Sequence, residues 1–445
     1  MTPRRMLLAA GSNAKGQLGI GSYDDAHTFT PCQFRFAAAA PSPRTEDQRP
    51  DSTSIGTGDV DVARIACGAN HTVVLLRHAE RDVGGATVQR MSLWGAGDGR
   101  RGQLGVGWQA PRAEAHGDEA SAGPSPWTTF CALALALDAV LSSDSEGWTY
   151  KDVAAAWETT YVVLARPGRS DVLLAMGSDD FELLGGGGGA PGTPRIVGFD
   201  HLFPHATLCV RRVHAGPRHV VAEVVMRTDA SARDENVLIG WGASRHGQLG
   251  PEHGGARCVA RPVRLPIRVD DDPVVSCALG NQHTVVLHAS GRISALGSNK
   301  QGQIPSLEDR VRICGLGCTW NSTFMQTVDG DKLGLLSTGN NAEGQLSRGS
   351  AVESSSAVAL PEDRALSSFV CGSEHVLATV SSSSQEDSVV GWGWNEHGNM
   401  GVGSVENIAI PTQLWPREDI DTFNKYPQRV IGIWAGYATS WLLVE

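Results

Sequence analysis

A glycine-containing segment of about nine residues recurs along the chain and constrains the fold more than any other feature. Its first copy, GSNAKGQLG at Gly11–Gly19, places two glycines around four residues. Five more copies keep this spacing, and one degenerate copy lacks the second glycine. The seven copies are Gly11–Gly19, Gly97–Gly105, Gly177–Gly185, Gly242–Gly250, Gly297–Ile304, Gly339–Leu346 and Gly393–Gly401. The pattern therefore predicts seven units of one supersecondary structure.

A second segment alternates with the glycine turns. Its clearest copies are ACGANHTVVL at Ala66–Leu75 and CALGNQHTVVL at Cys277–Leu287. Four copies contain a histidine, namely His71, His219, His283 and His375. Three variants lack it: Ala156–Val162, Thr319–Met325 and Gly436–Leu442. Each copy enters a short apolar run of the kind that forms a strand, so strands and tight turns alternate in every unit.

Seven β units with a period near 50 residues predict an all-β protein, specifically a seven-bladed β-propeller of four-stranded blades. We expect residues 1–445 to form this single domain. The chain begins on the second strand of a unit, at Met6–Ala10, and ends on the first strand of a unit, at Ser440–Val444. The ring should therefore close by pairing of the N-terminal and C-terminal strands.

Insertions interrupt the repeat, mostly in the first three units. Segments rich in proline, serine, glycine or charge are expected to be disordered or irregular at residues 37–58, 109–126, 185–194 and 381–388. The apolar segment Phe130–Leu141 is compatible with either a short helix on the flank of the ring or an extended strand.

Composition excludes several classes of function. The net charge is −11 and no cluster of basic residues is present, which argues against direct binding of nucleic acid through phosphate neutralisation. No signal peptide and no apolar run of about 18 residues is apparent, so we expect no membrane span and a location in the cytoplasm, with the nucleus as a second location. The nine cysteines are scattered, and the pair Cys314 and Cys318 lacks a second close pair. We therefore expect neither a metal site nor a cofactor.

The repeated motifs do not indicate catalysis. A P-loop requires lysine and then serine or threonine after its second glycine, whereas Gln17 and Leu18 follow here. The glycines are better explained as turn residues with positive φ. The four repeat histidines occupy equivalent positions on different blades, so they cannot converge, and we expect them to bond the backbone within or between blades. No catalytic residue is predicted.

A candidate protein-binding rim follows from the ring symmetry. Residues just after the glycine of the second segment should lie on one face, near the mouth of the central channel. The candidate partner-binding residues are Trp157, Glu158, Arg218, Trp320, Asn321, Glu374 and Tyr437. Exposed aromatics and arginine are typical of interface hot spots. The alternative is that the aromatics pack between blades.

The alternation of Gly-x-Asn-x-x-Gly-Gln-Leu-Gly with Cys-Gly-x-x-His-Thr, seven times over Met6 to Glu445, resembles the regulator of chromosome condensation propeller family. This resemblance implies a seven-bladed propeller that acts through protein surfaces. The last turn, Gly391–Gly401, is similar to the small single-propeller branch of the alpha-tubulin suppressor and secretion-regulating exchange factor type.

Two functions follow from the resemblance. The first is a non-catalytic interaction module that binds a small zinc-binding protein and regulates diphthamide synthesis and wobble-uridine tRNA modification, as the alpha-tubulin suppressor type does. The second is a guanine-nucleotide exchange factor for a small GTPase. A ubiquitin-ligase adaptor is a third, less favoured alternative. In each case we expect a chain that is monomeric on its own.

Overall fold

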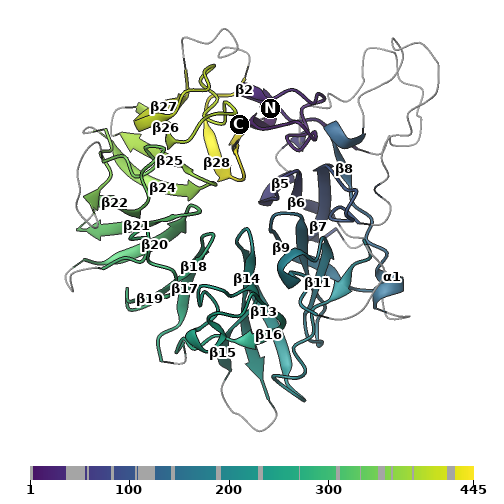
Figure 1. Cartoon of the computed structure of the whole chain (residues 1–445). Coiled ribbons are helices and arrows are strands. Elements are labelled where there is room, and N and C mark those ends of the chain that lie inside the picture. The colour runs from purple at the N-terminus through teal and green to yellow at the C-terminus, as the bar shows by residue number, and fades with distance from the viewer. Residues whose placement is uncertain are drawn as a thin grey trace, which may run out of the picture.

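The computed structural model describes residues 4–36, 56–57, 60–81, 85–105, 108, 126–141, 146–186, 192–228, 234–269, 271–306, 311–330, 332–348, 356–361, 364–382, 385–417 and 426–445. Seven sheets, antiparallel apart from the short β3–β8 pair, stand as blades around a central axis, as Figure 1 shows along that axis. The predicted seven-bladed β-propeller is confirmed. We number the blades so that blade 1 is the one built from both chain ends.

Each blade is ordered from the axis outward. The innermost strands are β5 (Val60–Cys67), β9 (Thr149–Ala155), β13 (Thr207–Ala215), β17 (Val274–Leu279), β20 (Ile313–Cys318), β24 (Ala365–Cys371) and β28 (Val430–Ala435). They belong to blades 2 to 7 and then blade 1. In the same order, the second strands are β6 (His71–Arg81), β10 (Thr159–Ala165), β14 (His219–Arg227), β18 (His283–His288), β21 (Ser322–Asp329), β25 (His375–Ser382) and β29 (Thr439–Val444).

The third strands lead into the glycine turns. They are β7 (Thr87–Gly97), β11 (Val172–Gly177), β15 (Glu235–Ala243), β19 (Ile293–Gly297), β22 (Lys332–Gly339), β26 (Gln385–Gly393) and β1 (Arg4–Gly11). The outer strands are β8 (Phe130–Ala132), β12 (Arg195–Ile196), β16 (Cys258–Arg264), β23 (Ser356–Ala357), β27 (Ile408–Trp415) and β2 (Ala26–Pro31). Within the described residues, blade 5 has three strands, β17 to β19.

The remaining elements are short. Strand β3 (Phe34–Arg35) extends blade 2 by pairing with β8, and β4 (Gly56–Thr57) pairs with the start of β1. The only α-helix among the described residues is α1 (Leu137–Val140), and three 3₁₀ turns occupy η1 (Pro126–Thr128), η2 (Asp180–Glu182) and η3 (Pro251–His253). Thus Phe130–Leu141 contains both a short strand and a short helix. No helix in the described part of the chain is long and apolar enough to cross a membrane.

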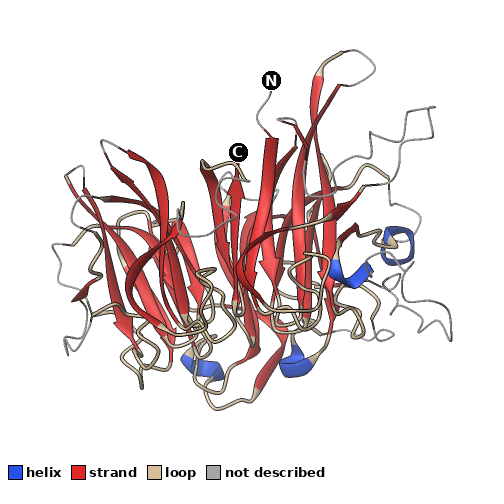
Figure 2. Ribbon diagram, turned by 90° about the horizontal axis from the view of Figure 1, so that it is seen from above, coloured by secondary structure: helices blue, strands red, loops and turns tan. Residues whose placement is uncertain are grey.

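The ends of the chain close the ring, as predicted. Strand β1 pairs antiparallel with β29, with Leu8 opposite Leu442, and β29 pairs in turn with the inner strand β28. The described ends of the chain, at β1 and β29, lie beside each other in Figures 1 and 2. All six residues of β29 are buried, so the closing strand is a core strand.

Of the predicted insertions, residues 37–55 and 109–125 lie outside the described residues, as do 187–191 and 383–384. The described parts of 381–388 belong to β25 and β26, which form a hairpin.

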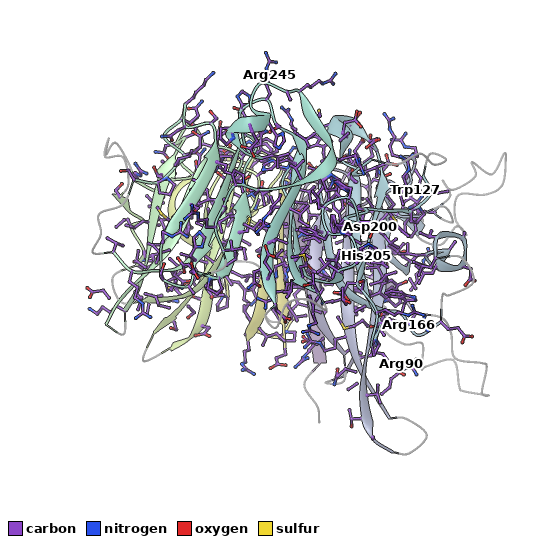
Figure 3. The ribbon with its side chains drawn as sticks, turned by 90° about the horizontal axis from the view of Figure 1, so that it is seen from below. Arg90, Trp127, Arg166, Asp200, His205 and Arg245 are labelled. Atoms are coloured by element: carbon purple, nitrogen blue, oxygen red, sulfur yellow. The ribbon has the colours of Figure 1, made fainter. Side chains whose placement is uncertain are left out.

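Strand direction gives the ring two different faces. The glycine turns and the links between first and second strands lie on one face, here called the turn face, and the hairpins between second and third strands lie on the other. Figure 3 shows Arg245 of a glycine turn and Arg90 of a hairpin at opposite ends of the molecule.

The glycine turns are held by the polar residues of the motif. In the first turn, Asn13 Oδ1 accepts a hydrogen bond from the Leu18 amide at 2.9 Å, and Gln17 Oε1 accepts one from the Lys15 amide at 2.9 Å. Gly16 has φ 77°, a left-handed conformation that glycine adopts without strain. The motif is therefore a structural turn, as predicted, and the Asn13 and Gln17 side chains bond the turn's own backbone.

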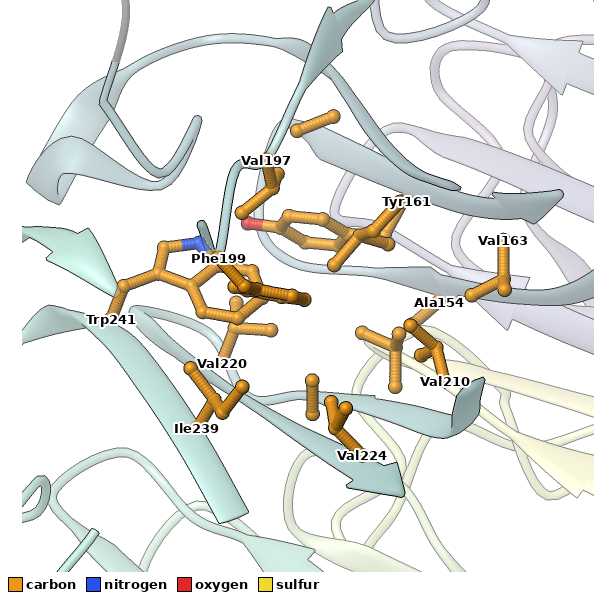
Figure 4. Packing of buried hydrophobic residues seen from close by; sticks show 14 of the residues in the cluster. Ala154, Tyr161, Val163, Val197, Phe199, Val210, Val220, Val224, Ile239 and Trp241 are labelled. Carbon is orange, nitrogen blue, oxygen red and sulfur yellow. The ribbon is translucent and has the colours of Figure 1, made fainter. Parts of the chain in front are cut away.

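The apolar core is divided into seven clusters, one at each interface between neighbouring blades. The largest joins blades 3 and 4 around Trp241 and Tyr161, whose rings lie 5.8 Å apart (Figure 4). Within the described part of the chain, the smallest joins blades 5 and 6 and contains three buried residues, Leu287, Ile313 and Met325. Burial between blades is the main stabilising contribution in a fold of this kind, so the blade 5–6 interface is the least stabilised.

The repeat histidines add a polar bond between blades. Nε2 of His71, His219, His283 and His375 lies 2.8, 2.8, 3.1 and 3.1 Å from a hydroxyl of the next blade. The predicted structural role of these histidines is consistent with this arrangement, but their Nε2 partners are side-chain hydroxyls, not backbone groups. Blades 3, 6 and 1 carry Thr159, Ser322 and Thr439 at the corresponding position.

The hydrogen-bond chain identifies the histidine tautomer. The hydroxyl of Thr284 donates to the Gln248 carbonyl at 2.9 Å, so its oxygen must accept from His219 Nε2–H. His283 and Thr323 repeat this arrangement, with Thr323 donating to the Gln303 carbonyl at 2.7 Å. Burial lowers the pKa of His219 to about 3 and that of His283 to about 4, so both rings are neutral near pH 7.

Candidate protein-binding face

Three aromatic side chains from distant blades meet on the turn face. Trp157, Trp320 and Tyr437 each follow an inner strand, in blades 3, 6 and 1 respectively. Their ring centroids lie 6.1 Å apart for Trp157–Trp320, 5.4 Å for Trp157–Tyr437 and 6.1 Å for Trp320–Tyr437. We call these three residues the aromatic cluster. They reach across the mouth of the central channel, so they do not pack between the blades.

The exposure of the cluster is uneven. Trp157 is 43% exposed, whereas Trp320 and Tyr437 are half-buried. Burial raises the pKa of the Tyr437 hydroxyl, which is therefore protonated at neutral pH. An exposed tryptophan supported by two other rings is a rigid apolar surface of the kind found at protein-binding hot spots.

Beneath the aromatic cluster, a cavity of about 150 Å³ occupies the channel. The last residues of several inner strands line it, including Cys67, Cys318 and Cys371. Burial raises the pKa of Cys67 and of Cys318 to about 12, so these thiols stay neutral. Among the described residues, no group of three or more His, Cys, Asp or Glu side chains is arranged to hold a metal ion.

Two predicted site residues, Asn321 and Glu374, bond each other between blades 6 and 7. Glu374 Oε1 accepts a hydrogen bond from Asn321 Nδ2 at 2.8 Å, and Oε2 accepts one from Gln345 Nε2 at 3.0 Å. Glu374 is only 7% exposed, and burial raises its pKa. The structure thus places this pair in the wall below the aromatic cluster, where both carboxylate oxygens are already engaged.

The other two predicted residues, Glu158 and Arg218, lie at an open pocket. Their cavity has a volume of about 350 Å³, and Trp157 and Trp320 form part of its wall. The Arg218 guanidinium lies 5.2 Å from the centroid of the Phe181 ring, a cation–π distance. Glu158 Oε2 lies 3.9 Å from Arg101 Nε of blade 2. The pocket therefore continues directly from the aromatic cluster toward blades 3 and 4.

Sequence reasoning missed Phe181, which forms the far wall of this pocket. Phe181 has φ 63° and Glu182 has φ 60°, both left-handed. Glu182 occupies the position at which the other six turns carry glycine with φ between 71° and 86°. The degenerate third turn was the signal, because losing that glycine forces a side-chain-bearing residue into a strained conformation. Such strain often accompanies a binding site.

The face as a whole offers a means of recognition: an exposed indole, an apolar pocket and a few charged groups at its edge. Its residues come from blades 3, 4, 5 and 6, so a ligand seated there would span several repeats.

Comparisons with known proteins agree with this architecture. The family model for the regulator of chromosome condensation (RCC1) repeat matches residues 235–287. The chain is 24% identical over 449 residues to an RCC1 repeat-containing protein of Schizosaccharomyces pombe, covering 99% of each chain. It is 26% identical over 451 residues to the mouse secretion-regulating guanine nucleotide exchange factor, covering 92% of this chain and 78% of that protein.

Solved structures show the same fold. Human WBSCR16 matches with a TM-score of 0.64 at 17% identity, covering 100% of this chain and 99% of that one. Prp20p of Saccharomyces cerevisiae, described with its binding to Gsp1p and histones, also matches with a TM-score of 0.64, at 16% identity and 100% and 92% coverage. At these identities the likeness concerns the fold alone.

Proposed function

Because this chain is a propeller of the RCC1-repeat type, we propose that it is a non-catalytic regulator that binds a protein partner on its turn face, over the aromatic cluster and the adjoining pocket. The observation that carries the proposal is the meeting of Trp157, Trp320 and Tyr437 from three distant blades. Placing an exposed indole in water has a free-energy cost that a partner's apolar surface would relieve.

A small GTPase is one candidate partner, because one relative over nearly the whole chain carries the name of a guanine nucleotide exchange factor. Exchange requires no bond-making by the propeller. Polar groups on the turn face of the propeller would compete for the contacts that hold Mg²⁺ and phosphate in the GTPase. Glu158, Asp180 and Arg218 at the pocket are the groups placed to do this.

A small zinc-binding protein of diphthamide synthesis is the other candidate, with a role in wobble-uridine tRNA modification. It is supported by the resemblance of Gly391–Gly401 to the alpha-tubulin suppressor type. The same turn face would be used, since a small folded partner needs only a compact rigid patch.

Affinity purification separates the two candidates. The wild-type chain, a Trp157→Ala/Trp320→Ala variant and a Phe36→Ala control would each be used as bait, Phe36 being an exposed aromatic on blade 2. Recovery of a GTPase, followed by faster GDP release in its presence, supports exchange. Recovery of a zinc-binding protein with diphthamide enzymes supports the other candidate.

Two results would contradict the proposal. If wild-type bait recovers neither class of partner, both partner assignments fail. If the double tryptophan variant recovers the partner as well as wild type and control do, the turn face is not the binding surface.

A further inference from the structure

Charge on the turn face is segregated by blade. At the fourth position of the glycine turns, blades 4 and 5 carry Arg245 and Lys300, whereas blades 3 and 7 carry Asp180 and Glu396. Arg218, which precedes β14 of blade 4, is the third cation of this set. All three side chains are exposed, and we call Arg218, Arg245 and Lys300 the basic arc. Its presence on a chain of net charge −11 requires an explanation.

The basic arc has no acidic counterpart in the described part of the chain. Two cations of the blade 2 turn differ in this respect: Arg100 Nη2 lies 2.5 Å from Asp98 Oδ2, and Arg101 Nε lies 3.9 Å from Glu158 Oε2. No ion pair joins Arg218, Arg245 or Lys300 to a carboxylate among the described residues. Unpaired exposed cations on neighbouring repeats are free to bind an anionic ligand.

The three cations act on one neighbouring residue. The pKa of His246 is lowered first by burial and then by the positive charges of Lys300, Arg245 and Arg218. A field that disfavours a further positive charge at His246 favours negative charge on a ligand at the same place.

Arg218 connects the basic arc to the apolar pocket. It lines the pocket together with Trp157, Trp320 and Phe181, so one residue belongs to both features. Asp180 lines the same pocket from blade 3 and forms no ion pair with another described residue. The pocket is thus apolar at its centre, positive toward blades 4 and 5, and negative toward blade 3.

From this arrangement we propose that the turn face binds an acidic peptide segment of a partner protein, with an aromatic or large apolar side chain in the pocket and carboxylates over the basic arc. Asp180 sets the direction, because it repels the acidic part of the segment from blade 3. The inference rests on the proposed function and specifies the chemistry of the partner.

A peptide fits these charges better than a nucleotide or nucleic acid does. An extended segment advances about 3.3 Å per residue, so its acidic residues can lie over turns of two blades while its anchor stays in the pocket. If the base of a nucleotide occupied the pocket, its phosphates would lie close to that base. They would then be near the carboxylates of Asp180 and Glu158, which repel them. A long polyanion would in addition be repelled by the net charge of −11.

Fluorescence anisotropy with defined peptides tests the proposal. The probe is a fluorescein-labelled peptide containing one tryptophan followed by a run of glutamates. Comparison peptides replace the glutamates by glutamine or the tryptophan by glycine, and GTP and a single-stranded oligonucleotide serve as competitors. The protein is the full chain, as wild type and as Arg218→Ala/Arg245→Ala/Lys300→Ala.

The matched control is Arg77→Ala/Arg90→Ala/Arg227→Ala. It removes the same amount of charge from exposed positions outside the turn face, where each arginine is paired with a carboxylate. Circular dichroism and thermal unfolding confirm that both triple variants fold.

We expect the basic-arc variant to bind the probe at least about ten-fold more weakly than wild type and the control, and wild-type affinity to fall as salt is added. Asp180→Asn should strengthen binding. The proposal is overturned if wild type does not bind the probe, if the glutamine peptide binds equally well, or if GTP or the oligonucleotide displaces the probe at lower concentrations than unlabelled peptide does. If the partner recovered by wild-type bait is retained by the basic-arc variant, this inference fails while the proposed function stands.

Discussion

The rings of Trp157 and Tyr437 lie edge to face, with centroids 5.4 Å apart and planes at 67°, although the two residues belong to blades 3 and 1. Aromatic pairs at this geometry contribute about 0.5–1.5 kcal/mol beyond the area they bury. The contact spans the channel mouth, so it joins two distant blades at an exposed surface.

Replacing Trp157 with alanine should separate binding from stability. Because Trp157 is 43% exposed, we expect the free energy of unfolding to fall by only about 1 kcal/mol. If Trp157 is a hot spot, partner affinity should fall by about 2 kcal/mol or more, roughly 30-fold. Urea unfolding and isothermal titration calorimetry measure the two quantities. Unchanged affinity in a stable variant would remove Trp157 from the interface.

Restoring the missing glycine of the third turn should stabilise the protein. Glu182 has φ 60° where the other turns carry glycine, a conformation that costs about 1 kcal/mol for a residue with a side chain. Glu182→Gly should raise the free energy of unfolding by about that amount. Glu252→Gly, in η3 of blade 4, serves as the control, since Glu252 is not among the left-handed residues of the described chain. A variant no more stable than wild type would show that the turn carries no strain.

Acid should weaken the bonds between blades. The pKa of His219 is lowered to about 3 in the fold, against about 6.5 when unfolded, so the unfolded chain binds more protons as pH falls. The contribution of this histidine is therefore complete above pH 6.5 and is lost progressively as pH falls from there toward about 3. At pH 5 the loss is about 2 kcal/mol.

His219→Thr provides the test, because blades 3 and 1 carry Thr159 and Thr439 at the same position. Threonine does not titrate, so the variant should be less stable than wild type at pH 7.5 but should lose less stability between pH 7.5 and pH 5. Parallel urea-unfolding curves at the two pH values measure this. Equal losses in both proteins would show that His219 is protonated without cost.

The blade 5–6 interface should open first. Among the described residues, its core contains Leu287, Ile313 and Met325 as the buried apolar residues, and every residue of β19 is only partly buried. Hydrogen exchange followed by mass spectrometry should show faster exchange in β19 and β20 than in β14 and β15, which flank the larger core around Trp241. Slower exchange in β19 than in β15 would contradict this ranking.

The fold could be predicted from the sequence because each blade corresponds to one copy of a sequence repeat. Glycines that must take positive φ recur once per blade, and the two incomplete ends identify the closing strands. The site could be predicted only in outline. Equivalent positions in a ring predict that Trp157, Trp320 and Tyr437 share a face, but not that their side chains are long enough to meet across the channel.

Other features depended on tertiary packing. Glu374 occupies the same ring position as the exposed Arg218, and only the donors Asn321 and Gln345 beside it explain why it turns into the wall. The wall formed by Phe181 depends on the strained backbone of the degenerate turn: the repeat reveals the missing glycine, but not where the Phe181 side chain lies. The unpaired state of the basic arc depends on which carboxylates lie nearby in space.

The closure of blade 1 also has a consequence for synthesis. Arg5 and Glu445 are hydrogen-bonded although they lie 440 positions apart, so the first strand emerges from the ribosome long before its partner exists. Until β29 is translated, the apolar edges of β1 and of blade 7 have no neighbour. Nascent chains with such exposed edges are prone to aggregate. The closing strand pair therefore leaves β1 without its partner until β29 has been translated.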